Sequence, residues 1–241
     1  MLGPRITLGK RRSDEGEKPF WISFSDLMSA LMVLFLVVMT VALLSVTQQL
    51  RDMEDKAGER QKEIDEIMDR LANLATSFPQ VHVSPERMTI DFGEVGRFAV
   101  NSDTLPAPGI DLLRSFVPKV LAEARTDLGQ KWFKRVVVEG FTDTDGSYLL
   151  NLDLSLRRAQ RVVCTLLTPG EAGAPTLSDP EMMDVRRLFL VGGYSSNSAR
   201  VSKEESRRVE LRLDFRAVDE EPLNTDHADT LSIDVGKCQL R

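Results

Sequence analysis

The sequence predicts one transmembrane helix near the N-terminus, a helical linker, and then an α/β sandwich in which helices cover one face of a mixed β-sheet. Three features support this prediction: a long apolar run, a segment with helical spacing behind it, and an order of elements that runs βαβα and then two strands. The chain of 241 residues leaves room for one domain of ordinary size behind the anchor. The expected divisions are a cytoplasmic tail at 1–19, the transmembrane helix at 20–46, the linker at 47–79, the sandwich at 80–216 and a C-terminal tail at 217–241.

The apolar run reads FWISFSDLMSALMVLFLVVMTVALLSV. From Leu27 onward about twenty residues carry no charge, enough at 1.5 Å per residue to cross the roughly 30 Å hydrocarbon layer. A signal peptide has a shorter apolar core and a small-residue cleavage site, so this segment is expected to stay in the mature protein. A basic cluster precedes it at residues 10–12, and the positive-inside rule then predicts a single pass through the bacterial inner membrane, with the N-terminus cytoplasmic and the C-terminal domain periplasmic.

Asp26 is the single carboxylate of this run. It follows Trp21, a residue suited to the membrane interface, and in a continuous helix it lies roughly 7 to 8 Å deeper. A carboxylate at such a depth usually faces protein or a water path and has a function. The alternative is that Asp26 lies at head-group level and caps a helix that begins at Leu27.

The linker has apolar residues at spacings of three and four, with charges filling most positions between them. This is the pattern of a helix that pairs with another helix along a narrow stripe, and a second, parallel copy of the chain is the simplest partner. A homodimer is therefore expected; the alternative is a helix lying on its own domain or on the membrane. Arg60 and Gly58 weaken the middle of the stripe. The stripe consists of Leu50, Met53, Ala57, Ile64, Ile67, Leu71, Leu74 and Phe78.

The domain itself contains four strand-like and two helix-like segments. Strands are expected at 88–92, 135–139, 187–191 and 209–215, helices at 110–124 and 149–167, and a loop rich in proline and glycine at 168–180. Cys164 and Cys238 both follow the transmembrane segment, where an oxidising compartment allows a disulfide that would pin the tail to the domain. Two unpaired thiols are the alternative.

Composition excludes several classes of function. A net charge of −6 and a pI near 5.2 argue against nucleic acid as a partner. The chain has only two histidines and two cysteines, and none of these residues lies at a metal-ligand spacing, so no metal or other cofactor is expected. No nucleophile with its base is apparent, which makes an enzyme the least favoured class.

Residues 138–167, VEGFTDTDGSYLLNLDLSLRRAQRVVCTLL, resemble the motif of the OmpA-like peptidoglycan-binding family, E-G-[HFY]-T-D-x-x-G-x4-N-x2-L-S-x2-R-A-x2-V. A later stretch, GGYSSNSARVSKEESRRVELRL, resembles the second block of the family, and in all the resemblance covers about 88–215. It implies an OmpA-like sandwich that binds the diaminopimelate of a peptidoglycan stem peptide. Asp143 would hold the ammonium and Arg158 the carboxylate. The other motif residues assigned to this site are Thr142, Asn151, Leu154 and Arg208.

The match departs from the family at Phe141, where histidine is common, at Asp145, an additional acid, and at Ser206, where asparagine is often found. These departures bear on the details of ligand choice. An alternative reading gives Asp143 and Arg158 structural roles, with the aspartate capping the helix and the arginine paired to it.

The pattern F-W-x4-D, an apolar span, a helical linker and an OmpA-like domain resembles the B subunits of ion-driven stators of the flagellar MotB type. Within this family the N-terminal segment looks most like the MotB-like subunit of the Zorya antiphage defence system. The resemblance implies that Asp26 takes up and releases the coupling ion, favoured as a proton over sodium, and that a ring of MotA-like multi-span subunits surrounds the dimer. A flagellar stator subunit, a passive wall anchor of the OmpA or Pal kind, and an energiser of the TonB–ExbD kind are the alternatives, the last of which lacks this wall-binding motif.

Overall fold

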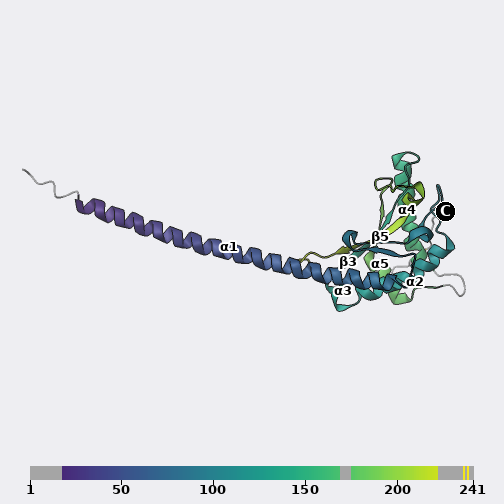
Figure 1. Cartoon of the computed structure of the whole chain (residues 1–241), viewed down its shortest axis with the longest axis horizontal. Helices are drawn as coiled ribbons and strands as arrows, with labels where there is room; N and C mark the ends of the chain where they lie inside the picture. The colour runs from purple at the N-terminus through teal and green to yellow at the C-terminus, as the bar shows by residue number, and fades with distance from the viewer. Residues whose placement is uncertain (1–17, 169–174, 222–235, 237, 239–241) are drawn as a thin grey trace, which may run out of the picture. The chain divides into compact units, whose positions relative to one another are not determined.

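The computed structural model describes residues 18–168 and 175–221, together with Gly236 and Cys238 (Figure 1). The chain forms two compact units, Met1–Lys56 and Ala57–Arg241, and helix α1 (Lys18–Ala75) contributes residues to both. The second unit therefore takes in the last part of the predicted linker. Most of the two predicted tails lies outside the described residues.

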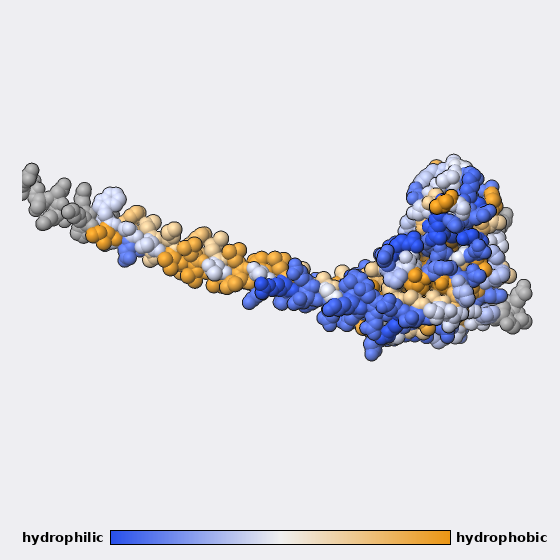
Figure 2. Space-filling view, viewed as in Figure 1, coloured by the Kyte–Doolittle hydropathy of each residue, from blue (hydrophilic) through white to orange (hydrophobic). Residues whose placement is uncertain are grey.

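The first unit consists of the N-terminal part of α1. Among the described residues, α1 alone is long and apolar enough to cross a membrane, and its most apolar stretch has a mean hydropathy of 2.8 with none of its residues buried (Figure 2). The hydroxyls of Thr40 and Thr47 donate to the carbonyl oxygens of Leu36 and Leu43, one turn earlier. These bonds satisfy polar side chains that an apolar surrounding would otherwise leave unpaired.

Asp26 lies within α1 and not at its start, which differs from the expectation that it caps a helix. The helix begins at Lys18, so Asp26 lies roughly two turns inside it and does not cap a helix starting at Leu27. The backbone around it is regular helix, because Leu27 and its neighbours continue the same element. The expectation that Asp26 caps a helix is therefore wrong.

The second unit is built on a mixed five-stranded sheet in the order β1-β2-β5-β3-β4. Strands β3 and β4 are parallel and the other neighbours are antiparallel. Side chains alternate along the strands, so that Val136 and Val138 of β3 and Leu211 and Leu213 of β5 enter the core. The strands are β1 (His82–Ser84), β2 (Thr89–Asp91), β3 (Phe133–Gly140), β4 (Phe189–Gly193) and β5 (Val209–Phe215).

Helices pack on this apolar face of the sheet and share one core with it, which confirms the predicted fold class. The helices are α2 (Ala107–Ala124), α3 (Asp127–Trp132), α4 (Tyr148–Leu167), α5 (Asp179–Leu188) and the short α6 (Lys203–Ser206), with 3-10 turns at Pro85–Arg87 and Gly93–Gly96. Among the strands and α-helices, β1, α3, α5 and α6 were not expected. Helix α5 delays the fourth strand to Phe189, two residues later than predicted. Its start is fixed by Ser178, whose amide and hydroxyl both donate to the carboxylate of Glu181.

The C-terminal part of α1 packs on its own domain. Ile64, Ile67 and Leu71 are fully buried in the common core, so this half of the predicted pairing stripe is covered without a second copy. Glu63 forms an ion pair with Lys131 at 2.6 Å and accepts a hydrogen bond from the indole of Trp132, and these two bonds lower the pKa of its carboxyl group. Residues 63–71 thus form a helix that lies on its own domain, which was the alternative expectation. The expectation that this part of the stripe pairs with a second copy is wrong.

Replacing Ile67 by alanine should lower the free energy of unfolding of the domain by about 2 to 5 kcal/mol, because a fully buried side chain leaves a cavity. Leu50→Ala is the control, since Leu50 belongs to the same stripe but is exposed, and its effect should stay within about 0.5 kcal/mol. Urea unfolding of the full chain in detergent, followed by near-UV circular dichroism, measures both. Equal losses in the two variants would mean that α1 does not pack as described.

Candidate functional site

The motif stretch forms a strand, a loop and a helix that lie in close contact. β3 ends at Gly140, the loop runs over residues 141–147, and α4 begins at Tyr148. A Cβ atom on Gly140 would lie 1.9 Å from the backbone oxygen of Ser155 in α4, so only glycine lets the helix cross the strand end at this distance. Gly146 has φ +94°, a conformation that also favours glycine, and it turns the loop into the helix. The two glycines of the motif thus place the loop between the end of the sheet and the start of α4.

Asp143 lies in this loop with 7% of its surface exposed. One carboxylate oxygen accepts from the amide of Asp145 at 3.2 Å, and the other accepts from Nη1 of Arg207 at 3.0 Å. The N-cap residue of α4 is Ser147, so Asp143 does not cap that helix. The ion-pair partner of Asp143 is Arg207. The alternative in which Asp143 caps the helix and pairs with Arg158 is therefore wrong on both points.

Arg158 of α4 is fully buried, and its guanidinium donates to three backbone carbonyl oxygens. The acceptors are Ser102 at 2.9 Å, Phe141 at 2.8 Å and Ala99 at 3.1 Å. The guanidinium carbon also lies 4.9 Å from the centre of the Phe98 ring. Burial lowers the pKa of this guanidinium to about 10, and the charge of Asp143 acts in the opposite direction. Two of the five N–H donors of this guanidinium bond none of these carbonyls. Because the side chain is fully buried, a ligand can reach them only if the residues that cover Arg158 move.

Asn151 holds the loop from the first turns of α4. Its side-chain amide donates to the backbone oxygens of Asp143 at 3.3 Å and Asp145 at 2.9 Å. Thr142 is buried, and its hydroxyl has no hydrogen-bond partner among the described residues. Leu154 of α4 is buried. Asn151 therefore braces the loop, while the Thr142 hydroxyl is buried beside it without a partner among the described residues.

Arg208 makes no hydrogen bond or ion pair with Asp143 among the described residues. Its Nε atom donates to Glu210 at 2.6 Å, and its guanidinium carbon lies 4.2 Å from the centre of the Phe141 ring, the residue that stands in place of histidine. The cation beside Asp143 is instead its neighbour Arg207, and Lys203 pairs with the extra acid Asp145 at 2.6 Å. The sequence motif contains both arginines, but spacing alone does not tell which of two consecutive side chains turns towards the loop.

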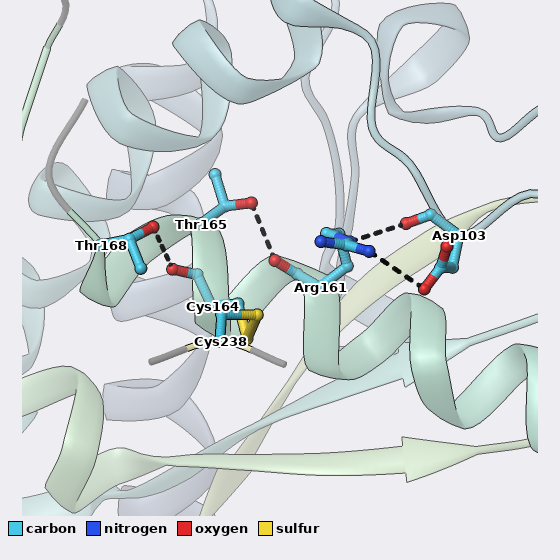
Figure 3. Close-up of a disulfide and its surroundings, with 6 residues drawn as sticks. All are labelled: Asp103, Arg161, Cys164, Thr165, Thr168 and Cys238. Carbon is cyan, nitrogen blue, oxygen red and sulfur yellow. Dashed lines mark hydrogen bonds and ion pairs between the residues drawn. A yellow bond between two sulfur atoms is a disulfide. The ribbon is translucent and has the colours of Figure 1, made fainter. Parts of the chain in front are cut away.

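The cysteines are joined in the structure, with the Cα atoms of Cys164 and Cys238 5.7 Å apart (Figure 3). One turn earlier on α4, Arg161 bonds both the backbone and the carboxylate of Asp103, each at 3.2 Å. Arg158 and Arg161 together attach α4 to the segment 99–103, and the disulfide attaches the tail to the same helix.

Replacing Cys238 by serine should lower the free energy of unfolding by about 2 to 4 kcal/mol, because the bridge restricts the unfolded chain between residues separated by 74 positions. A thiol reductant should produce the same loss in the wild type and no further loss in the variant. Urea unfolding with and without the reductant measures this. An unchanged midpoint in the wild type would mean that the bond does not form in the protein.

Asp26 belongs to the other unit. The hydroxyl of Ser29 donates to the backbone oxygens of Ser25 and Asp26, at 2.9 Å each, so the first polar group after the carboxylate is already satisfied within the helix. The side chains from Trp21 to Leu50 are all exposed in the single chain. This run needs lipid or partner helices around it.

Comparison with known proteins gives one curated relative of high similarity. The chain is 46% identical over 230 residues to the Zorya protein ZorB of Escherichia coli O139:H28 (strain E24377A / ETEC), covering 95% of this chain and 94% of that protein. No protein-family model matches the chain. Among solved structures, a putative MotB-like protein from Desulfovibrio vulgaris has a TM-score of 0.40 at 16% identity, covering 68% of this chain and 99% of that one. The OmpA-like domain of FopA1 from Francisella tularensis has a TM-score of 0.36 at 20% identity, covering 54% and 75%. Because both TM-scores are below 0.5, the fold is assigned from the strand order of the sheet and not from these likenesses.

Proposed function

The chain belongs to the family of the Zorya protein ZorB, and from this premise we propose that it is the B-type subunit of an inner-membrane, ion-driven stator that is anchored to peptidoglycan and works in antiphage defence. The observation that carries the proposal is the lone carboxylate of Asp26, which lies inside a helical run that otherwise has no charge between residues 20 and 46. A passive anchor has no use for such a group, because a charge within a membrane helix costs about 2.5 to 3.5 kcal/mol on insertion scales at the helix centre.

In the proposed mechanism, two copies of α1 stand inside a ring of MotA-like multi-span subunits. A carboxylate buried among apolar side chains favours its protonated form, and one in contact with water favours its charged form, so alternating surroundings would load and unload a proton at Asp26. The membrane potential supplies about 2.3 kcal/mol per unit charge and 100 mV. The exposed apolar surface of α1 is the surface on which the ring would pack.

The domain is proposed to hold the stator to the wall through the stem peptide of peptidoglycan. Around the loop, the carboxylates of Asp143 and Asp145 stand beside the cations Arg158, Arg207 and Lys203, a mixture that suits a ligand carrying both an ammonium and a carboxylate. We assign the ammonium to Asp143. The carboxylate goes to Arg158, which has two N–H donors left for it once the segment 99–102 moves aside.

Replacing Asp26 by asparagine should abolish phage protection in cells that also express the ring partner, because the amide cannot take up and release a proton. The control is Asp52→Asn, which changes an exposed acid of the same helix beyond the apolar run and should protect like the wild type. Phage survival, motility and the amount of protein in the membrane are measured together. Full protection by Asp26→Asn would end the ion-driven proposal and leave a passive anchor, and loss of motility in place of protection would indicate a flagellar stator.

Replacing Asp143 by asparagine should weaken binding to purified peptidoglycan roughly tenfold, because a charge-assisted bond to the ammonium is lost. The fold should survive, since the amide oxygen of asparagine still accepts from the backbone amide of Asp145, and only the bond from Arg207 to the second carboxylate oxygen is lost. Asp153→Asn, an exposed acid on α4 that pairs with Arg157, is the control. Co-sedimentation with sacculi measures binding, and equal sedimentation of both variants would exclude Asp143 from the ligand site.

A further inference from the structure

A second cluster of charged side chains surrounds a cavity away from the loop. The cavity has a volume of about 280 Å³ and lies where α1, the connection between β1 and β2, and strands β3 and β5 meet. Its charged lining consists of Arg60, Arg87, Lys134, Arg135, Arg212 and Asp214. Cations therefore outnumber carboxylates five to one in the wall of the cavity.

The neighbouring acids compensate only part of this charge. Asp214 is shared between Arg135 and Arg212, at 2.8 Å each. Arg212 also bonds Glu139, and Lys134 pairs with Glu220. The five cations thus have three carboxylates among their ion-pair partners, which leaves two positive charges at the cavity.

Three of the guanidinium groups also have unused donors. Arg60 donates through Nε to the backbone oxygen of Arg216 at 2.6 Å, Arg135 through Nε to Asp214, and Arg87 through Nε to Ser84 at a long 3.4 Å. The terminal Nη atoms of these three arginines have no hydrogen-bond partner in the part of the chain that the structure describes. All three side chains line the same cavity.

We propose that this cavity binds a phosphate group. A carboxylate has two oxygens and one charge, whereas a phosphate group has three or four oxygens and a charge of about −1.5 to −2, which matches three guanidinium groups with free donors and two uncompensated positive charges. Asp214 holds Arg135 and Arg212 in place for this contact. A bound phosphate would also connect Arg60 of α1 to the sheet and so strengthen the packing of α1 on the domain. A free phosphate compound and a phospholipid head group present the same chemistry.

The test uses the full chain in neutral detergent with radiolabelled inorganic phosphate, in equilibrium dialysis at constant ionic strength. Wild type should bind one phosphate per chain, and Arg87→Gln and Arg135→Gln should each bind roughly tenfold more weakly. The matched control is Arg125→Gln: Arg125 and Arg135 are 45% and 43% exposed, and each pairs with an aspartate, at 2.6 and 2.8 Å. Arg87→Gln removes only the long bond to Ser84, so its fold should be intact, which the thermal midpoint checks.

A second arm separates the two sources of phosphate. Micelles doped with phosphatidic acid should displace the label if a lipid head group reaches the cavity, and should leave it bound if only soluble phosphates do. Acetate at the same ionic strength should displace nothing. The proposal is overturned if neither inorganic phosphate nor phosphatidic acid binds, if Arg87→Gln binds as the wild type does, or if acetate competes equally.

Discussion

The burial of the Arg158 guanidinium is the constraint on which the candidate site depends. Removing such a charge from water costs several kcal/mol unless its donors are satisfied, so the chain has to supply acceptors around it. It does so with the backbone oxygens of Ala99, Ser102 and Phe141. Two of these acceptors fix the segment before α2, and the third fixes the first residue of the loop that carries Asp143. The position of the loop carboxylate is thus set by an arginine on the next helix.

This arrangement explains why the elements around the candidate site could be predicted from the sequence but the contacts within it could not. Helical periodicity predicted α4, and the resemblance to the OmpA-like family pointed to the loop and to Arg158. The partners of Arg158 are carbonyl oxygens from a distant segment, and no side-chain pattern marks a carbonyl as an acceptor. For the same reason the sequence does not tell which of Arg207 and Arg208 contacts Asp143. The two side chains point in different directions just before β5, and only the packed structure shows that Arg207 faces Asp143.

The linker shows a related limit. A stripe of apolar residues at spacings of three and four indicates that one face of a helix is buried. The same stripe appears whether the face packs on a second copy or on the chain's own domain. Ile67 and Leu71 belong to such a stripe, and the domain covers them. What separates the two cases is the charged residues beside the stripe: Arg60 and Glu63 find their partners on the domain at Arg216 and Lys131. Helix α5 was missed for another reason, since its N-cap Ser178 lies within the stretch rich in proline and glycine that predicts a loop at 168–180.

The two charged regions of the domain differ in a way that bears on what each can bind. Around Asp143 the cations exceed the carboxylates by only one, and each loop carboxylate already has a cation beside it. A neutral ligand with separated charges can exchange with such pairs without changing the total charge. At the cavity near Arg135 the acids are fewer than the cations, and the free donors are all guanidinium groups. A zwitterion would leave two positive charges uncompensated there, whereas a dianion would neutralise them. Because desolvating unpaired like charges costs free energy, the second region favours an anion for the same physical reason that the first favours a zwitterion.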